Sequence, residues 1–254
     1  MSPIKAVKAA YFSPSGGTKR AAMLLCGQFG LPTEPIDCTC PPAKLPAVIP
    51  VAKDELLVLA LPVYGGFGPR VEGLFSQLRG QGGPCVILTA YGNRDYENAL
   101  AAAARQMTEQ GFVCVGGIAP ITPHVFAPSL GAGRPDKEDM PAFAAFAKKV
   151  LAACESEPLR PAALPGDANA PRKPLRPIGR SRDKERCNHC GRCVRACPAG
   201  ALNELLEVDG AKCVNCLVCR FSCPTYAWQF DTSQTKAWLE ENFSARRAVE
   251  WFAE

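Results

Sequence analysis

The chain has 254 residues, a formal net charge of +5 and a hydrophobic share of 47%, which suits one large domain or two of moderate size. No apolar run is long enough to cross a membrane, and the first residues lack the apolar core of a secretion signal, so we expect a cytoplasmic protein without membrane insertion. Fourteen cysteines in a compartment where thiols stay reduced favour metal binding over disulfides.

The N-terminal half alternates apolar runs with amphipathic ones, which predicts a doubly wound parallel sheet. The predicted strands are residues 6–13, 33–39, 55–66, 84–93 and 112–121, and the predicted helices are 18–30, 94–111 and 137–156. The third and fourth strands are apolar throughout, as expected when both faces of a parallel sheet are covered. Ligands bind such sheets at the carboxyl ends of the strands.

The loop after the first strand, SPSGGT, has the composition of a phosphate site. Its glycines allow the backbone to wrap a phosphate, and its hydroxyls and the following helix N-terminus can donate hydrogen bonds. The lysine of a nucleoside-triphosphate loop is missing. The candidate residues are Ser13, Ser15, Gly16, Gly17 and Thr18. The alternative is a glycine turn followed by an ordinary helix N-cap.

Two further loops follow the next strands and are rich in tyrosine and glycine. The candidate residues are Tyr64, Gly65 and Gly66 in one loop, and Tyr91, Gly92, Asn93 and Tyr96 in the other. Taken alone, the tyrosines are typical of the edge of a core. Their position at successive strand ends favours a ligand site.

Eight cysteines form two copies of C-x2-C-x2-C-x3-C-P, repeated at an interval of 26 residues. Three closely spaced thiolates suit three irons of one [4Fe–4S] cubane, and the fourth cysteine of each copy completes the other cluster. The predicted ligands of the first cluster are Cys187, Cys190, Cys193 and Cys223, and those of the second are Cys213, Cys216, Cys219 and Cys197. Zinc is the alternative, but it prefers two spaced pairs of ligands. The other six cysteines are typical of buried small hydrophobic residues.

The segments beside the motifs complete the domain plan. Residues 157–181 are rich in proline, alanine and arginine and predict a semi-extended linker. Their basic charge suits charge balance of a cluster or docking of a protein partner better than nucleic acid, because no aromatic residues are interleaved. Residues 232–254 predict a helical tail that packs back on the protein.

The cysteine motifs resemble bacterial dicluster ferredoxins over residues 182–231, and the three loops resemble those that hold FMN in flavodoxins. With the phrases YGNRDYENAL and GRPDKED, the chain resembles the EFR-type flavodoxin–ferredoxin fusion family over residues 1–231. The resemblance implies an α/β flavodoxin-like domain with a five-stranded parallel sheet over residues 1–156, and a small α+β dicluster ferredoxin domain.

The resemblance also implies FMN, two [4Fe–4S] clusters and redox partner proteins. We therefore expect an electron-transfer iron–sulfur flavoprotein. The alternative is a flavin-dependent reductase of a small substrate, which receives its electrons through the ferredoxin domain. His124 is the one acid–base candidate near the loops for that alternative.

Overall fold

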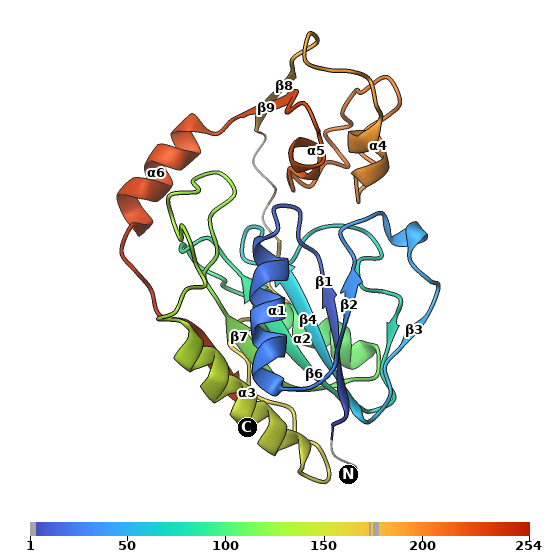
Figure 1. Ribbon diagram of the computed structural model, residues 1–254, viewed down its shortest axis with the longest axis vertical. Helices are drawn as coiled ribbons and strands as arrows, with labels where there is room; N and C mark the ends of the chain where they lie inside the picture. The colour runs from blue at the N-terminus through green and yellow to red at the C-terminus, as the bar shows by residue number, and fades with distance from the viewer. Residues whose placement is uncertain (1–3, 173, 175–177) are drawn as a thin grey trace.

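The computed structural model describes residues 4–172, 174 and 178–254. Its centre is a six-stranded sheet in the order β10-β7-β6-β4-β1-β2 (Figure 1). The parallel strands are β1 (Ala6–Tyr11), β2 (Thr33–Asp37), β4 (Glu55–Pro62), β6 (Pro84–Ala90) and β7 (Val113–Ala119). Counted among themselves, they follow the 2-1-3-4-5 order of flavodoxin-like sheets. The predicted five-stranded parallel sheet is confirmed for these strands.

Helices cover both faces of this sheet, which explains why its central strands are apolar along their length. α1 (Gly17–Phe29) and α3 (Met140–Cys154) pack on one face, and α2 (Ala99–Glu109) packs on the other. Side chains along a strand alternate between the two faces. In β4, Leu56 therefore lies in the hydrophobic core between the sheet and α1 and α3, and Leu57 lies in the core between the sheet and α2.

One predicted helix begins later than expected. The sequence predicts a helix over 94–111, but α2 begins at Ala99. Asn93 and Glu97 have φ values of 64° and 43°, which lie in the left-handed region and are incompatible with an α-helix. The residues before α2 therefore belong to the loop at the end of β6.

Short elements fill the long connections on either side of β4. They are the 3-10 helix η1 (Pro42–Lys44) and the two-residue strands β3 (Ile49–Pro50) and β5 (Leu78–Arg79). The two strands pair with each other in parallel.

The C-terminal tail returns to the sheet. α6 (Ser233–Phe243) ends the helical part, and β10 (Glu250–Ala253) pairs antiparallel with β7. The prediction of a helical tail is therefore wrong for its last residues. Trp251 packs against one core and Phe252 against the other. Two adjacent aromatic residues that face opposite sides fit the period of a strand and fill the free edge of β7.

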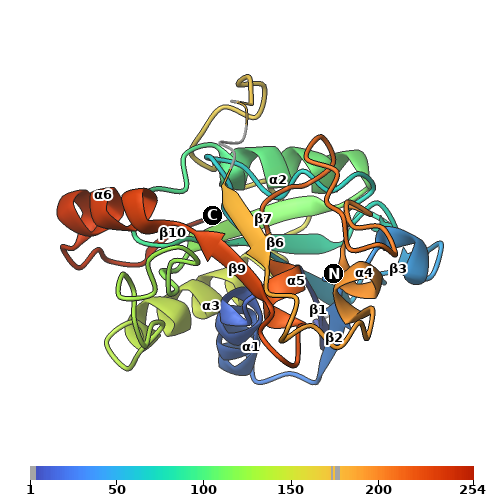
Figure 2. The ribbon, with the colours of Figure 1, turned by 90° about the horizontal axis from the view of Figure 1, so that it is seen from above.

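The cysteine-rich segment lies over the carboxyl ends of the parallel strands (Figures 1 and 2). It contains the short helices α4 (Arg192–Ala196) and α5 (Val218–Phe221), and it is closed by β8 (Gly179–Arg182), which pairs antiparallel with β9 (Trp228–Asp231). Val214 in this segment belongs to the core cluster on the α2 face of the sheet. The contact between the two parts therefore includes apolar packing at Val214, and Lys44 Nζ also donates a hydrogen bond of 2.8 Å to the Arg195 backbone oxygen.

Both ends of the cysteine-rich segment are attached to the sheet. On the linker side, Ala162 N–H donates to the backbone oxygen of Cys114 in β7 at 2.8 Å, and Leu164 packs against the core. The guanidinium of Arg172 lies 4.8 Å from the centre of the Phe67 ring. The predicted linker 157–181 therefore contacts the α/β part at Ala162, Leu164 and Arg172, and its residues from Gly179 on belong to β8. Residues 173 and 175–177 lie outside the described residues. On the other side, the chain returns through α6 to β10.

Among the helices of the described residues, none combines the length and apolar character that crossing a membrane requires.

Candidate cofactor sites

Two cavities in the described part of the cysteine-rich segment are each lined by four motif cysteines. The cysteines of the inner cavity are Cys197, Cys213, Cys216 and Cys219. Those of the outer cavity are Cys187, Cys190, Cys193 and Cys223. Trp228 lines both cavities. Each cavity therefore combines three cysteines of one motif with the fourth cysteine of the other.

The two motifs repeat their backbone as well as their sequence. His189 and Asn215, which stand at the same place in the two copies, have φ values of 52° and 54°. Gly191 and Leu217 also correspond, with φ values of 68° and 58°, and each precedes a short helix. These left-handed residues curl the chain tightly, so that the first three cysteines of each copy surround one cavity.

Hydrogen-bond donors point at several of these sulfurs. Ala201 N–H donates to Cys197 Sγ at 3.2 Å, and Ala227 N–H donates to Cys223 Sγ at 3.3 Å. Arg180 Nη1 donates to Cys213 Sγ at 2.9 Å. Such donors favour thiolates, which are the form that binds iron.

Two of the inner cysteines need a compensating positive charge to ionise. Burial raises the pKa of Cys216 and of Cys219 to about 12, because a thiolate is costly in an apolar environment. Bound iron would supply the compensating charge. In the described part of the chain, no three His, Cys, Asp or Glu side chains are placed to hold a single metal ion. Cubane ligands need not converge in that way, because each iron takes its own cysteine.

The residue that precedes α1 is a glycine, so it supplies no side-chain cap of its own. Gly16 precedes the helix with φ 85°, and Ser15 and Gly16 are exposed. The hydroxyl of Ser13 accepts a hydrogen bond from Lys19 N–H at 2.9 Å, and Thr18 is buried. Of the three predicted hydroxyls, Ser15 is therefore the exposed one. A basic residue and no acidic residue in the first helical turn favour an anion at this end.

The second loop is a tight turn that contacts the cysteine-rich segment. Tyr64 and Phe67 exchange backbone hydrogen bonds of 2.7 and 3.3 Å across Gly65 and Gly66, whose φ values are 57° and 83°. A side chain on Gly66 would be strained by the φ value of 83°, and its Cβ would lie 3.0 Å from Glu97 Cβ, so the position favours glycine. Burial, with a smaller contribution from Cys216, raises the pKa of Tyr64 well above its ordinary value. Tyr64 packs against the core cluster that contains Cys216 of the inner cavity.

The third loop is covered by the C-terminal tail rather than open. Asn93 Nδ2 donates to the backbone oxygens of Phe243 at 2.6 Å and of Ala245 at 2.8 Å. The rings of Tyr91 and Tyr96 are buried and meet edge to face, with centres 5.5 Å apart. Within the described residues, the Tyr91 hydroxyl and Asn93 Oδ1 are buried without a hydrogen-bond partner. The loop therefore holds two polar atoms that a bound group could satisfy.

Gly92 and His124 pack closely beside this loop. A Cβ on Gly92 would lie 2.3 Å from His124 Cδ2. His124 Nδ1 accepts a hydrogen bond from Phe126 N–H at 3.1 Å. Burial, assisted by the charge of Arg94, lowers the pKa of His124 to about 4. The imidazole is therefore neutral near pH 7.

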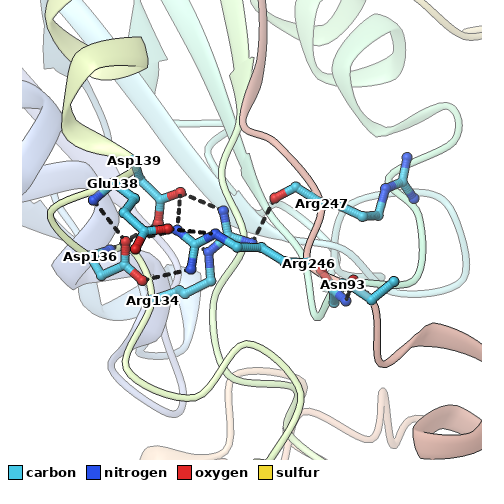
Figure 3. Close-up of polar contacts among 8 residues, drawn as sticks. Asn93, Arg134, Asp136, Glu138, Asp139, Arg246 and Arg247 are labelled. Carbon is cyan, nitrogen blue, oxygen red and sulfur yellow. Dashed lines mark hydrogen bonds and ion pairs between the residues drawn. The ribbon is translucent and has the colours of Figure 1, made fainter.

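An ion-pair network, which we call the C-terminal clamp, fixes the tail to the loop before α3 (Figure 3). It comprises Arg134, Asp136, Asp139, Arg246 and Arg247. Arg134 and Asp139 are 5% and 4% exposed and form a bidentate pair, in which Nε and Oδ2 are 3.1 Å apart. Arg246 Nη2 contacts Asp136 at 2.8 Å and Asp139 at 3.3 Å. Arg134 Nη1 donates to the Arg247 backbone oxygen at 2.8 Å.

The segment GRPDKED, to which the sequence analysis assigned no structural role, supplies Arg134, Asp136 and Asp139 of the C-terminal clamp. Sequence reasoning missed the contact between this phrase and the tail. The paired arginines at 246 and 247, opposite a phrase with three acidic residues, were the available signal.

Sequence comparison identifies a known domain in the cysteine-rich segment. Residues 181–202 match the family model of the 4Fe-4S binding domain. A pyruvate synthase subunit PorD from Methanothermobacter marburgensis is 36% identical over 45 residues, which are 18% of this chain and 56% of that protein. An uncharacterized protein from Methanothermobacter thermautotrophicus is 39% identical over 54 residues, or 20% of this chain and 12% of that protein. The match thus covers less than two thirds of either relative.

Solved structures resemble the α/β part. A flavodoxin from Streptococcus pneumonia TIGR4 is 17% identical, with a TM-score of 0.42 over 58% of this chain and 98% of that chain. A flavodoxin from the domain Archaea is 14% identical, with a TM-score of 0.41 over 59% of this chain and 99% of that chain. Because these TM-scores lie below 0.5, the strand order of the sheet, and not this likeness, assigns the fold. That strand order and the matched segment make the chain a fusion of a flavodoxin-like α/β domain with a 4Fe–4S binding domain.

Proposed function

We propose that this chain is an electron-transfer protein that holds FMN and two [4Fe–4S] clusters and exchanges electrons with redox partner proteins. Its flavodoxin-like domain comprises residues 1–156, and its ferredoxin domain comprises residues 182–231. The tail 232–254 belongs with the flavodoxin-like domain, because β10 extends the sheet.

The two cysteine-lined cavities support two clusters with crossed ligands. Cys213, Cys216, Cys219 and Cys197 would hold the inner cluster, and Cys187, Cys190, Cys193 and Cys223 would hold the outer one. The donors on Cys197 and Cys223 come from equivalent places in the repeat and would stabilise the ligand thiolates. Arg180 would offset part of the negative charge of the inner cluster.

The three strand-end loops support FMN. Ser15, Gly16 and the remaining free N–H groups at the N-terminus of α1 would hold its phosphate. The Tyr91 hydroxyl and Asn93 Oδ1 are buried polar atoms that a flavin could satisfy. The turn at Gly65–Gly66 would offer backbone groups to the ring. Because the tail covers the third loop, it would form part of the same wall.

The observation that carries the proposal is the contact between the second loop and the inner cavity. Tyr64 packs against the apolar cluster that contains Cys216, Val214 and Val218. Flavin takes up one or two electrons and a cubane takes up one, so the pair can couple the two kinds of redox chemistry. Apolar packing that excludes water would hold the two sites at a fixed separation.

The reductase alternative has less support. It needs a group that moves protons beside the flavin, and His124 is the candidate. Its Nδ1 is engaged by Phe126 N–H, and its pKa is lowered to about 4, so it supplies no proton near pH 7. We therefore place electron transfer between proteins first.

Cofactor content tests the proposal. Protein purified or reconstituted without oxygen should contain about eight irons, matching sulfide and one FMN per chain. Tightly bound zinc without acid-labile sulfide would contradict the cluster assignment. A chain that leaves FMN fluorescence unchanged in a titration would contradict the flavin assignment.

A further inference from the structure

The two cysteine cavities are built from equivalent halves of the 26-residue repeat, but one pair of equivalent positions differs in chemistry. Arg180 lines the inner cavity, and Leu206, which stands 26 residues later, lines the outer one. The backbone pairing follows the same repeat: β8 pairs with β9, and the equivalent positions Val208 and Leu202 form an isolated bridge. The repeat therefore places a guanidinium at the inner cavity where it places an apolar side chain at the outer one.

The guanidinium of Arg180 is held against a predicted ligand sulfur. Its Nη1 donates to Cys213 Sγ at 2.9 Å, and its Nη2 donates to Asn215 Oδ1 at 3.0 Å. Asn215 is 9% exposed, whereas His189, which stands at the equivalent place in the first motif, is exposed. The second motif therefore provides both the sulfur that Arg180 contacts and the buried side chain that orients it.

Arg180 acts on the inner cavity more directly than the charges around it. Apart from the cysteines, it is the one ionisable side chain among the described residues that line this cavity, and it is half-buried. Arg182 on the same strand lines neither cavity. Lys212 is exposed and lies 3.8 Å from Asp209, and Arg220 in α5 is exposed. A charge in apolar surroundings is screened less than one in water.

The charges around the outer cavity are of both signs and mostly exposed. Arg192 lines this cavity and is exposed. Glu204 and Glu207 are exposed on the loop that contributes Leu206, and Arg186 lies 3.4 Å from Asp183. The negative charge of each proposed cluster acts on the other to the same extent, so it does not distinguish the two cavities.

The two cavities also differ in burial, which affects how readily a cluster is reduced. Cys197 and Cys216 of the inner cavity are 8% and 7% exposed, whereas Cys190 of the outer cavity is exposed. Reduction adds one negative charge to a cubane, which apolar surroundings disfavour and a cation or hydrogen-bond donor at a ligand sulfur favours. Burial alone would therefore make the inner cluster harder to reduce than the outer one.

We propose that Arg180 selectively raises the reduction potential of the inner cluster, and so offsets the effect of its burial. This keeps the inner cluster able to accept an electron from the outer one. In that step one electron leaves the reduced outer cluster and reduces the inner cluster, and no bond is made or broken. The inference deepens the proposed function and rests on it, because it assigns a role to a residue toward the proposed inner cluster.

A redox titration of the cluster-loaded full chain, followed by electron paramagnetic resonance, tests the proposal. The signal of the inner cluster is the one that Cys213→Ala alters. Arg180→Met removes both the charge and the donor, and Arg180→Gln removes the charge but keeps a donor. Arg220→Met is the matched control, because it removes an exposed arginine that follows Cys219 of the same predicted cluster.

We expect Arg180→Met to lower the equilibrium constant for one-electron reduction of the inner cluster about tenfold, which is a shift of about 59 mV. The reason is that hydrogen bonds between charged groups are among the stronger ones. Arg180→Gln should cause a smaller decrease. The equilibrium constant of the outer cluster should stay within about twofold of the wild type in both variants. Arg220→Met should change that of the inner cluster by less than about twofold, because solvent screens an exposed charge.

The outcomes separate this inference from the function on which it rests. Arg180→Met with the wild-type iron content and an unchanged potential of the inner cluster would overturn the role of Arg180 alone. Equal shifts of both clusters, or an equal effect of Arg220→Met, would also overturn it, because Arg180 would then not act through Cys213. If Arg180→Met fails to retain clusters, Arg180→Gln decides the case by the same criteria. Absence of iron and sulfide from the wild-type chain would instead overturn the proposed function.

Discussion

Replacing Arg134 by leucine should loosen the tail more than any other single change in the C-terminal clamp. The substitution leaves the Asp139 carboxylate, which is 4% exposed, without its bidentate partner. Breaking a buried pair in this way costs about 3–5 kcal/mol. Arg246 Nη2 remains 3.3 Å from Asp139, so we expect the lower end of that range. The lost hydrogen bond to the Arg247 backbone oxygen adds about 1 kcal/mol. The expected loss is about 4 kcal/mol.

The loss should appear first where the tail joins the sheet. Amide hydrogen exchange of β10 reports local opening, and urea unfolding of the cofactor-loaded chain reports the global loss. Arg246→Leu is the matched control: it also pairs with Asp136 and Asp139, but its side chain is 44% exposed and should matter far less. The double variant Arg134→Leu/Asp139→Leu should recover much of the stability, because no unpaired charge remains buried. Equal losses for Arg134→Leu and Arg246→Leu would refute this reasoning.

Three further predictions concern His124 and the cluster ligands. Because the pKa of His124 falls from 6.5 to about 4 on folding, the unfolded chain binds the proton first as pH falls, and stability on the order of 2 kcal/mol should be lost between pH 6.5 and pH 4. In urea titrations, His124→Gln should reduce the dependence of the unfolding free energy on pH over this range. An unchanged pH dependence would contradict this role of His124. Thr225 Oγ1 lies 3.5 Å from Cys223 Sγ and can form a hydrogen bond with this sulfur, which valine cannot. Thr225→Val should therefore lower the reduction potential of the outer cluster alone by roughly 20–60 mV in a redox titration. A shift in the potential of the inner cluster would contradict the assignment of Cys223 to the outer cluster. Cys197→Ala should alter the same paramagnetic resonance signal as Cys213→Ala, and different affected signals would mean that the ligands are not crossed.

The parallel sheet could be predicted because its signals are local. β4 and β6 are apolar along their length, and glycines end the runs that lead into loops. The cysteine spacing likewise indicated two sets of four, which the structure gathers around two cavities. A repeat written into the sequence needs no knowledge of distant contacts.

The tail could not be predicted from local pattern. Trp238, Leu239 and Phe243 have helical spacing, and nothing nearby marks where the helix stops. The strand at Glu250–Ala253 exists because β7 offers a free edge, and the clamp exists because Arg246 and Arg247 meet a loop more than a hundred residues away. The covered third loop follows from the same long-range contacts.

The contact between the two halves could not be predicted from the composition of the linker either. The basic charge of the linker indicated charge balance of a cluster or docking of a protein partner, and it gave no sign of how the two halves contact each other. In the structure the contact between the two halves combines apolar packing through Val214 and Val218 with a hydrogen bond from Lys44 to the Arg195 backbone, and the ferredoxin domain is attached to the sheet on both sides. A basic composition indicates long-range electrostatic attraction, but the side chains that become buried at a contact determine which interaction stabilises it.

The central claim is that FMN and the clusters exchange electrons inside one chain. The direct test is to reduce the clusters of the loaded chain rapidly and to follow the flavin absorbance by stopped flow at several protein concentrations. Because both ends of the ferredoxin domain are attached and the contact at Val214 is apolar, we predict one rate constant that is independent of protein concentration and nearly independent of salt. A rate that rises in proportion to protein concentration would contradict the account, since the electrons would then pass between molecules.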